Sequence, residues 1–300
     1  MFTKICQMSQ DKLKNFVAKE LEKTHDNVIV ADGFVYAQGT FPVLLVAHLD
    51  TVHTQLPQSI IYNKKKGQLS SPQGIGGDDR CGVYMILEII KEYNCSVLFC
   101  EEEESGAIGA DKFTKSKLAK NLEFNYIIEL DRRGKNDAVF YDCDNKDFEE
   151  FITKDYYKTA WGTFSDISVI APELKCAAVN LSCGYYNAHT KEEYVVLAEM
   201  EESINRVCKI LERTTDDDKF EYIEVVYDNN ASLWGLDDDW HFNNYTEKYY
   251  LIMWYDKEHD SDEWKEVCAH SREEAIGKFL IDHPTLSYDD IDVYDLENYS

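Results

Sequence analysis

Histidines and carboxylates follow several apolar segments of this sequence. His48 and Asp50 end the segment PVLLVAHLD, and side chains two residues apart on a strand face the same side. Other such residues at segment ends are Asp78, Asp79, Glu103, Glu104, Asp131 and His189. Because the carboxyl ends of parallel strands meet at one edge of a sheet, we expect these side chains to converge there.

A cluster of imidazole and carboxylate groups favours zinc or a similar transition ion, whereas calcium and magnesium prefer oxygen ligands alone. A two-metal site needs a bridging carboxylate, and the water that it activates needs a general base that is not itself a ligand. The adjacent Glu103 and Glu104 can supply one ligand and one base. Taken singly, the acids have simpler explanations, as a helix cap at Asp78, a solvated glutamate run, or a turn at Asp131.

The motifs HLDTV, GGDDRCG, EEESGAIGA, IIELD and YYNAHTKEEY together resemble the co-catalytic di-zinc exopeptidases, which include peptidase T, aminoacylase and the single-domain zinc aminopeptidases. The resemblance covers roughly residues 25–212. It implies that His48 and Asp131 bind one zinc ion and that Glu104 and His189 bind a second. It also implies that Asp78 bridges the two ions.

The same resemblance assigns the groups that do not bind metal. It implies that Glu103 is the general base, that Asp50 orients His48, and that a cis peptide bond joins Asp78 to Asp79. The implied cofactors are two zinc ions, for which cobalt or manganese could substitute.

The resemblance therefore implies a hydrolase that cleaves peptide or amide bonds with a metal-bridged hydroxide and a glutamate base. An aminopeptidase is the leading interpretation. The alternatives are a dipeptidase or an N-acyl-amino-acid deacylase and, in a different class, a catalytically silent binding protein on the same fold. Weaker candidates for substrate contacts are Tyr186 (or its neighbour Tyr185), Arg132 and Asp166.

The spacing of the motifs excludes the inserted domains of some relatives. Between Asp131 and His189 there are 57 residues, too few for a lid and dimerisation domain. Between Asp50 and Asp78 there are 27, too few for the insertion of the large tetrahedral aminopeptidases. We therefore expect a minimal catalytic domain without the usual dimer interface.

The segments between the motifs alternate between the periods of strands and helices. Apolar runs predict strands at 43–47, 95–100, near 126–131 and at 176–181, and NVIVADGFVYAQG predicts a hairpin around Asp32-Gly33. Helical spacing is found at 9–23, 80–93, 146–157 and 198–213. This order predicts an α/β fold with a mixed, largely parallel central sheet sandwiched by helices. The resemblance implies that this fold is of the zinc-exopeptidase (phosphorylase/hydrolase-like) type.

Composition changes near residue 215. The last 85 residues hold 24 acidic and 6 basic side chains, a net charge of −18 out of −26 for the whole chain. We therefore expect a catalytic domain at 1–215 and an acidic, aromatic-rich accessory α+β domain at 216–300. So negative a chain is not expected to bind nucleic acid.

The accessory domain reads as strand, strand, helix and strand, with Ser271 and Glu274 as a capping box. It is a candidate surface for a protein partner, while the catalytic domain would bind a peptide or acyl-amino-acid substrate. No membrane span or signal peptide is expected. Nine cysteines without a C-x-x-C pair favour reduced thiols, and hence a cytoplasmic location.

Overall fold

The computed structural model describes residues 1–225, 248–256, 261–269, 275–276, 278–279, 283 and 291–295. The chain forms two compact units, Met1–Tyr227 and Asp228–Ser300. This division falls later than the boundary predicted after residue 215. No helix among the described residues is long and apolar enough to cross a membrane.

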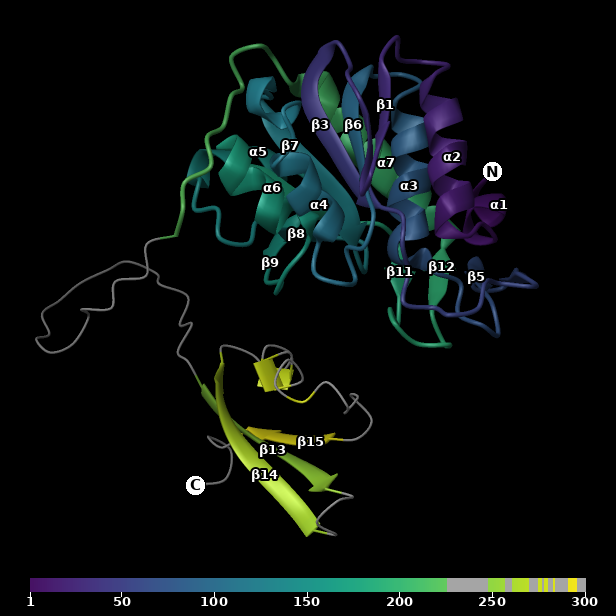
Figure 1. The fold of residues 1–300 in the computed structure, drawn as a ribbon, viewed down its shortest axis with the longest axis vertical. Helices are drawn as coiled ribbons and strands as arrows, with labels where there is room; N and C mark the ends of the chain where they lie inside the picture. Colours follow the sequence, from purple (N-terminus) through teal and green to yellow (C-terminus); the bar gives the residue numbers. More distant parts are fainter. Residues whose placement is uncertain are drawn as a thin grey trace, which may run out of the picture. The chain divides into compact units, whose positions relative to one another are not determined.

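An eight-stranded sheet forms the centre of the first unit, with the order β1-β2-β6-β3-β7-β10-β8-β9 (Figure 1). Its strands are β1 (Val28–Ala31), β2 (Phe34–Ala37), β3 (Phe41–His48), β6 (Cys95–Cys100), β7 (Tyr126–Arg132), β8 (Asp137–Val139), β9 (Lys158–Ala160) and β10 (Ala178–Ser182). The central strands β6, β3, β7 and β10 are parallel. Their carboxyl ends therefore lie at one edge, and the mixed, largely parallel sheet predicted from the sequence is confirmed.

Helices cover both faces of this sheet. They are α1 (Phe2–Cys6), α2 (Gln10–Leu21), α3 (Gly77–Ile89), α4 (Ile108–Thr114), α5 (Lys146–Thr153), α6 (Asp166–Leu174) and α7 (Leu197–Arg213). One core contains residues of α1, α2, α3, α5 and α7, and the other contains residues of α4 and α6. Along β3, Val43 and Leu45 face the first core while Leu44 and Val46 face the second. Burial on both faces explains why the segment is apolar throughout.

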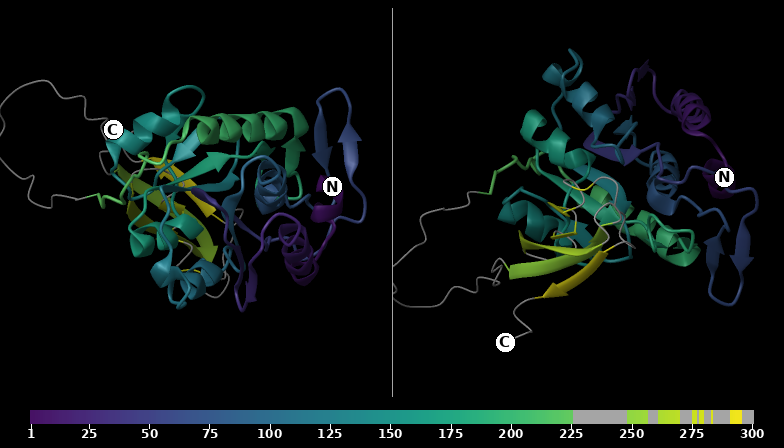
Figure 2. Two further views of the ribbon diagram at one scale, coloured as in Figure 1. Left: turned by 90° about the horizontal axis from the view of Figure 1, so that it is seen from above. Right: turned by 60° about the horizontal axis from the view of Figure 1, so that its bottom comes forward.

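A smaller sheet with the order β11-β12-β5-β4 lies in the same unit. It contains β4 (Ile61–Asn63), β5 (Gln68–Ser70), β11 (Tyr185–Tyr186) and β12 (Tyr194–Val196). Figure 2 shows the hairpin of β4 and β5, in blue, on the side of the amino terminus. These short strands were not predicted from the sequence, because three residues are too few to establish a period.

The predicted positions of the long elements agree with the structure within a few residues. The helix α7 begins at Leu197, one residue before its predicted start, and Glu193 precedes β12. The helix α6, which carries Asp166, was not predicted.

Residues 214–225 belong to the first unit by their contacts. The ring of Phe220 packs against Tyr126, Phe148 and Phe151 with ring centroids 5.2–6.1 Å apart. Its backbone nitrogen donates to the carbonyl of Asn125 at 2.9 Å. The segment therefore completes the aromatic core beside β7.

Truncation tests this assignment. We expect a chain ending after Tyr227 to melt cooperatively near the temperature of the first unit in the full chain. A chain ending after Arg213 loses the partly buried Phe220 and should be less stable by about 1–3 kcal/mol, since full burial of a phenylalanine side chain contributes about 1.5–3 kcal/mol. Thermal unfolding followed by circular dichroism measures both. Equal melting temperatures for the two truncations would contradict the assignment.

The second unit contains a three-stranded antiparallel sheet with the order β14-β13-β15. Its strands are β13 (Lys248–Asp256), β14 (Ser261–Ala269) and β15 (Ile291–Asp295). Residues 275–276 and 278–279 are helical, in agreement with the predicted order of strand, strand, helix and strand. Ala275 and Phe279 are buried with Tyr250 and Ile252. The predicted capping box at residues 271–274 lies outside the described residues.

Candidate metal centre

Three of the predicted ligands meet at the ends of the central strands. His48 is the last residue of β3, and Asp131 lies near the end of the adjacent strand β7. The Nε2 atom of His48 is 3.0 Å from Oδ1 of Asp78 and 3.4 Å from Oδ1 of Asp131. All three side chains are largely buried, so these donor atoms face one another rather than solvent.

A second set shares Asp78 with the first. The Nε2 atom of His189 is 3.2 Å from Oδ2 of Asp78 and 3.2 Å from Oε1 of Glu104. His189 lies in the loop between β11 and β12, has a left-handed backbone with φ of 65°, and is 54% exposed at its side chain. Asp78 thus directs one oxygen to each histidine. That arrangement suits a carboxylate that bridges two cations.

The separations within each set fit zinc. Bonds of about 2.0–2.1 Å in tetrahedral coordination place two ligands of one ion about 3.3 Å apart. The separations between each histidine nitrogen and the carboxylate oxygens that would share its ion are 3.0–3.4 Å, and the donor atoms of each set all lie within 4.8 Å of one another. The ligand types, two imidazoles and three carboxylates, are also those that zinc accepts. The residues present therefore fit two transition ions.

Asp50 connects the histidine strand to the glutamate loop. Its Oδ1 is 3.2 Å from Nδ1 of His48, the ring nitrogen opposite the one that faces the carboxylates. The carboxylate also accepts hydrogen bonds from the backbone nitrogens of Glu103 and Glu104, each at 3.1 Å. A carboxylate in this position fixes the tautomer and the ring orientation of a metal-binding histidine.

The four consecutive glutamates after β6 separate into two pairs. Glu101 pairs with Lys14, and Glu102 accepts from the amide of Gln10 at 3.2 Å. Glu103 and Glu104 instead form a cluster with His48, with one donor atom of each within 4.8 Å of the others. Two of the four are therefore structural, and the two that precede Ser105 face the centre.

The helix α3 begins next to Asp78, the residue predicted to bridge the two ions. The peptide bond between Asp78 and Asp79 is cis, as the resemblance implies. Asp79 is fully buried, and its carboxylate accepts from the backbone nitrogens of His48 at 3.2 Å and Gly82 at 2.8 Å. A Cβ on Gly82 would lie 1.7 Å from the carbonyl oxygen of Leu130, so only glycine allows this approach of α3 to β7.

Asp131 is fixed by side chains that were not predicted as ligands. Its backbone nitrogen donates to Oδ1 of Asn180 at 3.0 Å, where the pairing of β7 with β10 changes register. The hydroxyl of Tyr185 donates to the carbonyl oxygen of Asp131 at 2.6 Å. A buried asparagine in an otherwise apolar strand was the available signal for Asn180.

The histidines sit in a strongly acidic field. Hydrogen bonds to Asp78 and then to Glu104 raise the pKa of His189 to about 11. Burial lowers the pKa of His48, but the Asp131 carboxylate and the hydrogen bonds to Asp50 and Asp78 together raise it well above its usual value. The surrounding carboxylates thus favour a positive charge at the positions of both imidazoles.

Burial, together with repulsion between the carboxylates of the site, raises the pKa of two of them. Burial and the charge of Asp78 raise the pKa of Asp131 to about 7. Burial raises the pKa of Glu103 to about 8, and the charges of Asp131 and Glu104 contribute in the same direction. Bound cations would relieve this repulsion and would favour the ionised carboxylates.

The weaker substrate candidates are not among the residues of the two donor sets. The Tyr186 hydroxyl donates to Glu199 at 2.5 Å. The Nε of Arg132 is 3.3 Å from Asp137, and its Nη2 donates to the carbonyl of Trp161. Asp166 is fully buried at the start of α6, where burial and the charge of Glu103 raise its pKa to about 8. The side chain of Asp166 is thus enclosed in this structure, and Tyr185 rather than Tyr186 contacts a predicted ligand.

Two further buried charges were not assigned a role from the sequence. Arg80 is almost completely buried and donates to the carbonyl oxygens of Leu49 and Asp50. Glu193 is fully buried beside the start of α3. Arg80 belongs to the motif GGDDRCG, whereas nothing in the sequence distinguishes Glu193 from the exposed Glu192.

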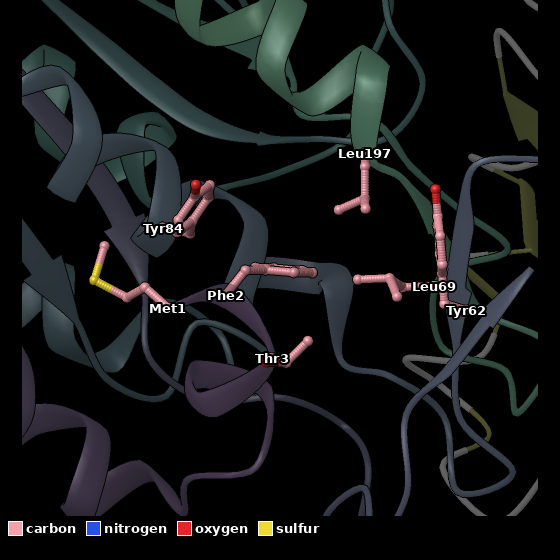
Figure 3. Close-up of a pocket in the computed structure, with 7 residues that line it drawn as sticks. All are labelled: Met1, Phe2, Thr3, Tyr62, Leu69, Tyr84 and Leu197. Carbon is pink, nitrogen blue, oxygen red and sulfur yellow. The ribbon is translucent and has the colours of Figure 1, made fainter. Parts of the chain in front are cut away.

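A shallow apolar cavity of about 240 Å³ lies apart from these residues. Its lining consists of Met1, Phe2, Thr3, Tyr62, Leu69, Tyr84 and Leu197 (Figure 3). None of these seven residues has an imidazole, carboxylate or amine side chain, so they offer no ligand of the kind found in the two donor sets.

Comparison with known proteins agrees with the geometry. The profile of peptidase family M28 matches residues 27–173. Aminopeptidase PepT from Bacillus cereus is 15% identical, with a TM-score of 0.58 over 70% of this chain and 96% of that one. A tripeptidase from Staphylococcus aureus is 13% identical, with a TM-score of 0.56 over 70% of this chain and 95% of that one.

An aminopeptidase from the archaeon Desulfurococcus kamchatkensis is 14% identical, with a TM-score of 0.55 over 72% of this chain and 95% of that one. At these identities the likeness of the structures concerns the fold. No curated protein sequence matches the chain.

Proposed function

We propose that this chain, whose residues 27–173 match the profile of peptidase family M28 and whose fold is that of known aminopeptidases, is a two-zinc aminopeptidase. The observation that carries the proposal is the pair of donor sets that share Asp78, with separations of 3.0–3.4 Å. His48 and Asp131 would hold one ion, and Glu104 and His189 the other.

Zinc ions bound there would polarise the carbonyl of the scissile bond and lower the pKa of a water molecule. Glu103 would take the proton of that water and pass it to the leaving amine. Its backbone nitrogen donates to Oδ1 of Asp50 at 3.1 Å, and its carboxylate lies near His48 and Glu104. Asp50 would therefore position both the base and His48.

Charge favours an amine over a carboxylate as the recognised group. Five carboxylates surround the centre, Asp50, Asp78, Glu103, Glu104 and Asp131, and two zinc ions supply four positive charges. The centre would thus remain negative. An α-ammonium group is attracted to such a site, whereas the carboxylate of an N-acyl amino acid is repelled. Arg132, which could otherwise bind a carboxylate, is paired with Asp137.

Matched substrates test this preference. We expect leucine p-nitroanilide to be hydrolysed with a kcat/KM about 100-fold higher than N-acetyl-leucine p-nitroanilide, because hydrogen bonds to a charged group contribute about 1.5–3 kcal/mol. Initial rates of p-nitroaniline release with zinc-loaded protein measure the ratio. If leucine is released from N-acetyl-leucine faster than p-nitroaniline is released from leucine p-nitroanilide, the protein is a deacylase. Zinc binding without turnover of a peptide and acyl-amino-acid library would indicate a binding protein.

A further inference from the structure

Glu193 is a fully buried carboxylate that accepts hydrogen bonds from the loop of Gly76 and Asp78 and also contacts His53. Its Oε1 accepts from the backbone nitrogen of Asp78 at 3.0 Å, and its Oε2 accepts from the backbone nitrogen of Gly76 at 2.7 Å. Its Oε2 is also 2.8 Å from Nε2 of His53, whose side chain is only 9% exposed. One side chain therefore fixes the backbone that carries the proposed bridging ligand.

The loop is shaped to admit this carboxylate. Gly76 has a left-handed backbone with φ of 65°. A Cβ on Gly77 would lie 3.2 Å from Oε1 of Glu193 and 2.8 Å from Cβ of Tyr185. A larger residue at position 77 would thus push the loop away from the carboxylate. The turn at Gly76 and Gly77 therefore leaves room for the carboxylate of Glu193.

A buried carboxylate is costly unless its oxygens are satisfied, and here backbone N–H groups and a histidine satisfy them. Glu193 lies four residues after His189, in the segment that connects β11 to β12. It therefore joins the segment that carries His189 to the backbone of Asp78. These are two of the three ligands of the proposed second zinc site.

The two proposed sites differ in how they are held. His48 and Asp131 lie on β3 and β7, which pair directly in the central sheet. His189 lies on a loop and is the most exposed of the proposed ligands. The spacing of the second site therefore depends on contacts between loops, and Glu193 makes such a contact at both of its oxygens.

We propose that Glu193, oriented by His53, is a positioning residue that sets the spacing between Asp78 and His189 and so controls the affinity of the second zinc site. The inference rests on the proposed two-zinc function. It predicts a larger effect on the second site than on the first. Both sites share Asp78, but the other two ligands of the first site, His48 and Asp131, lie on paired strands that do not depend on Glu193.

Stepwise zinc titration of the metal-free full chain tests the proposal, with competition against a fluorescent chelator as the measurement. In Glu193→Gln the amide nitrogen cannot accept from Gly76 or His53. We expect zinc affinity at the weaker, second step to fall by about 10–100-fold, the usual effect of losing a group that orients a metal ligand. The first step should change by less than about threefold. Excess zinc should restore most of the lost kcat, because Glu193 acts through metal occupancy and not through the substrate.

Glu192→Gln is the matched control, since it removes the same charge from an exposed neighbour. It should titrate as the wild type does. His53→Ala leaves both backbone hydrogen bonds of Glu193 in place, and we expect a smaller loss, again confined to the second step. In the double variant His53→Ala/Glu193→Gln, the loss should not exceed that of Glu193→Gln alone, because His53 acts through Glu193.

Wild-type protein that binds fewer than two zinc ions would contradict the proposed function itself. Wild-type protein that binds two, together with a Glu193→Gln variant that loses affinity equally at both steps or at neither, would overturn the positioning role. If Glu193→Gln does not fold, His53→Ala decides the question, and a wild-type titration of that variant overturns the proposal.

Discussion

Replacing Glu103 by glutamine is expected to lower kcat by at least about 10²–10⁴-fold, the usual contribution of a general base. Both zinc ions should remain bound, because Glu103 is not among the ligands proposed for either ion. Glutamine has nearly the shape of glutamate but cannot take a proton, so the change isolates proton transfer. The measurement is kcat beside zinc content by elemental analysis.

Neighbouring glutamates are the controls for this prediction. Glu102 faces Gln10, so Glu102→Gln should keep both ions and near-normal kcat. Glu104→Gln should lose occupancy of the second site, since Glu104 lies 3.2 Å from His189. If Glu103→Gln loses zinc while Glu102→Gln keeps both ions and is inactive, the assignment of base and ligand is displaced by one residue.

Changing Asp78 is expected to have the widest effect on metal binding, because Asp78 belongs to both donor sets. Asp78→Asn should bind at most one zinc ion tightly and should lose activity with substrates that the wild type cleaves. In the wild type, chelation should lower the melting temperature of the first unit. An ion present at 100 times its Kd stabilises the folded state by about 2.7 kcal/mol, which corresponds to about 5–10 °C for a unit of this size.

The two changes should interact. Chelation should shift the melting temperature of Asp78→Asn much less than that of the wild type, because the variant has less bound metal to lose. Differential scanning calorimetry with and without chelator measures both shifts. Equal shifts in the two proteins would show that the stabilisation by bound metal does not depend on Asp78.

Predictions from the sequence were most accurate where residue type and period both constrain the structure. The continuous apolar run of β3 is buried on both faces, and an apolar run of this length is typical of a central strand. The strand ends follow from the same pattern, since His48 is the first residue of that run with a charged or ligating side chain. The convergence of His48 with Asp131 then follows from parallel pairing.

The roles of the four consecutive glutamates could be predicted from the sequence only in part. Four identical side chains in a row do not indicate which of them face the site, and only the resemblance to known exopeptidases selected Glu103 and Glu104. The structure separates them because Lys14 and Gln10, from the distant helix α2, hold Glu101 and Glu102. Partners 87 and 92 residues away leave no mark on the run itself.

The sequence by itself determined the central sheet, the order of the ligand-bearing segments and the chemical types of the donors, because these depend on local period and residue type. Only the tertiary structure decided which buried polar groups support them. Asp166, a substrate candidate by sequence, is enclosed at the start of α6. Glu193, indistinguishable from Glu192 in sequence, is enclosed beside the backbone of Asp78, the proposed bridging ligand. The physical reason is that the burial of a charge is set by partners brought from distant segments, and no window of neighbouring residues contains them.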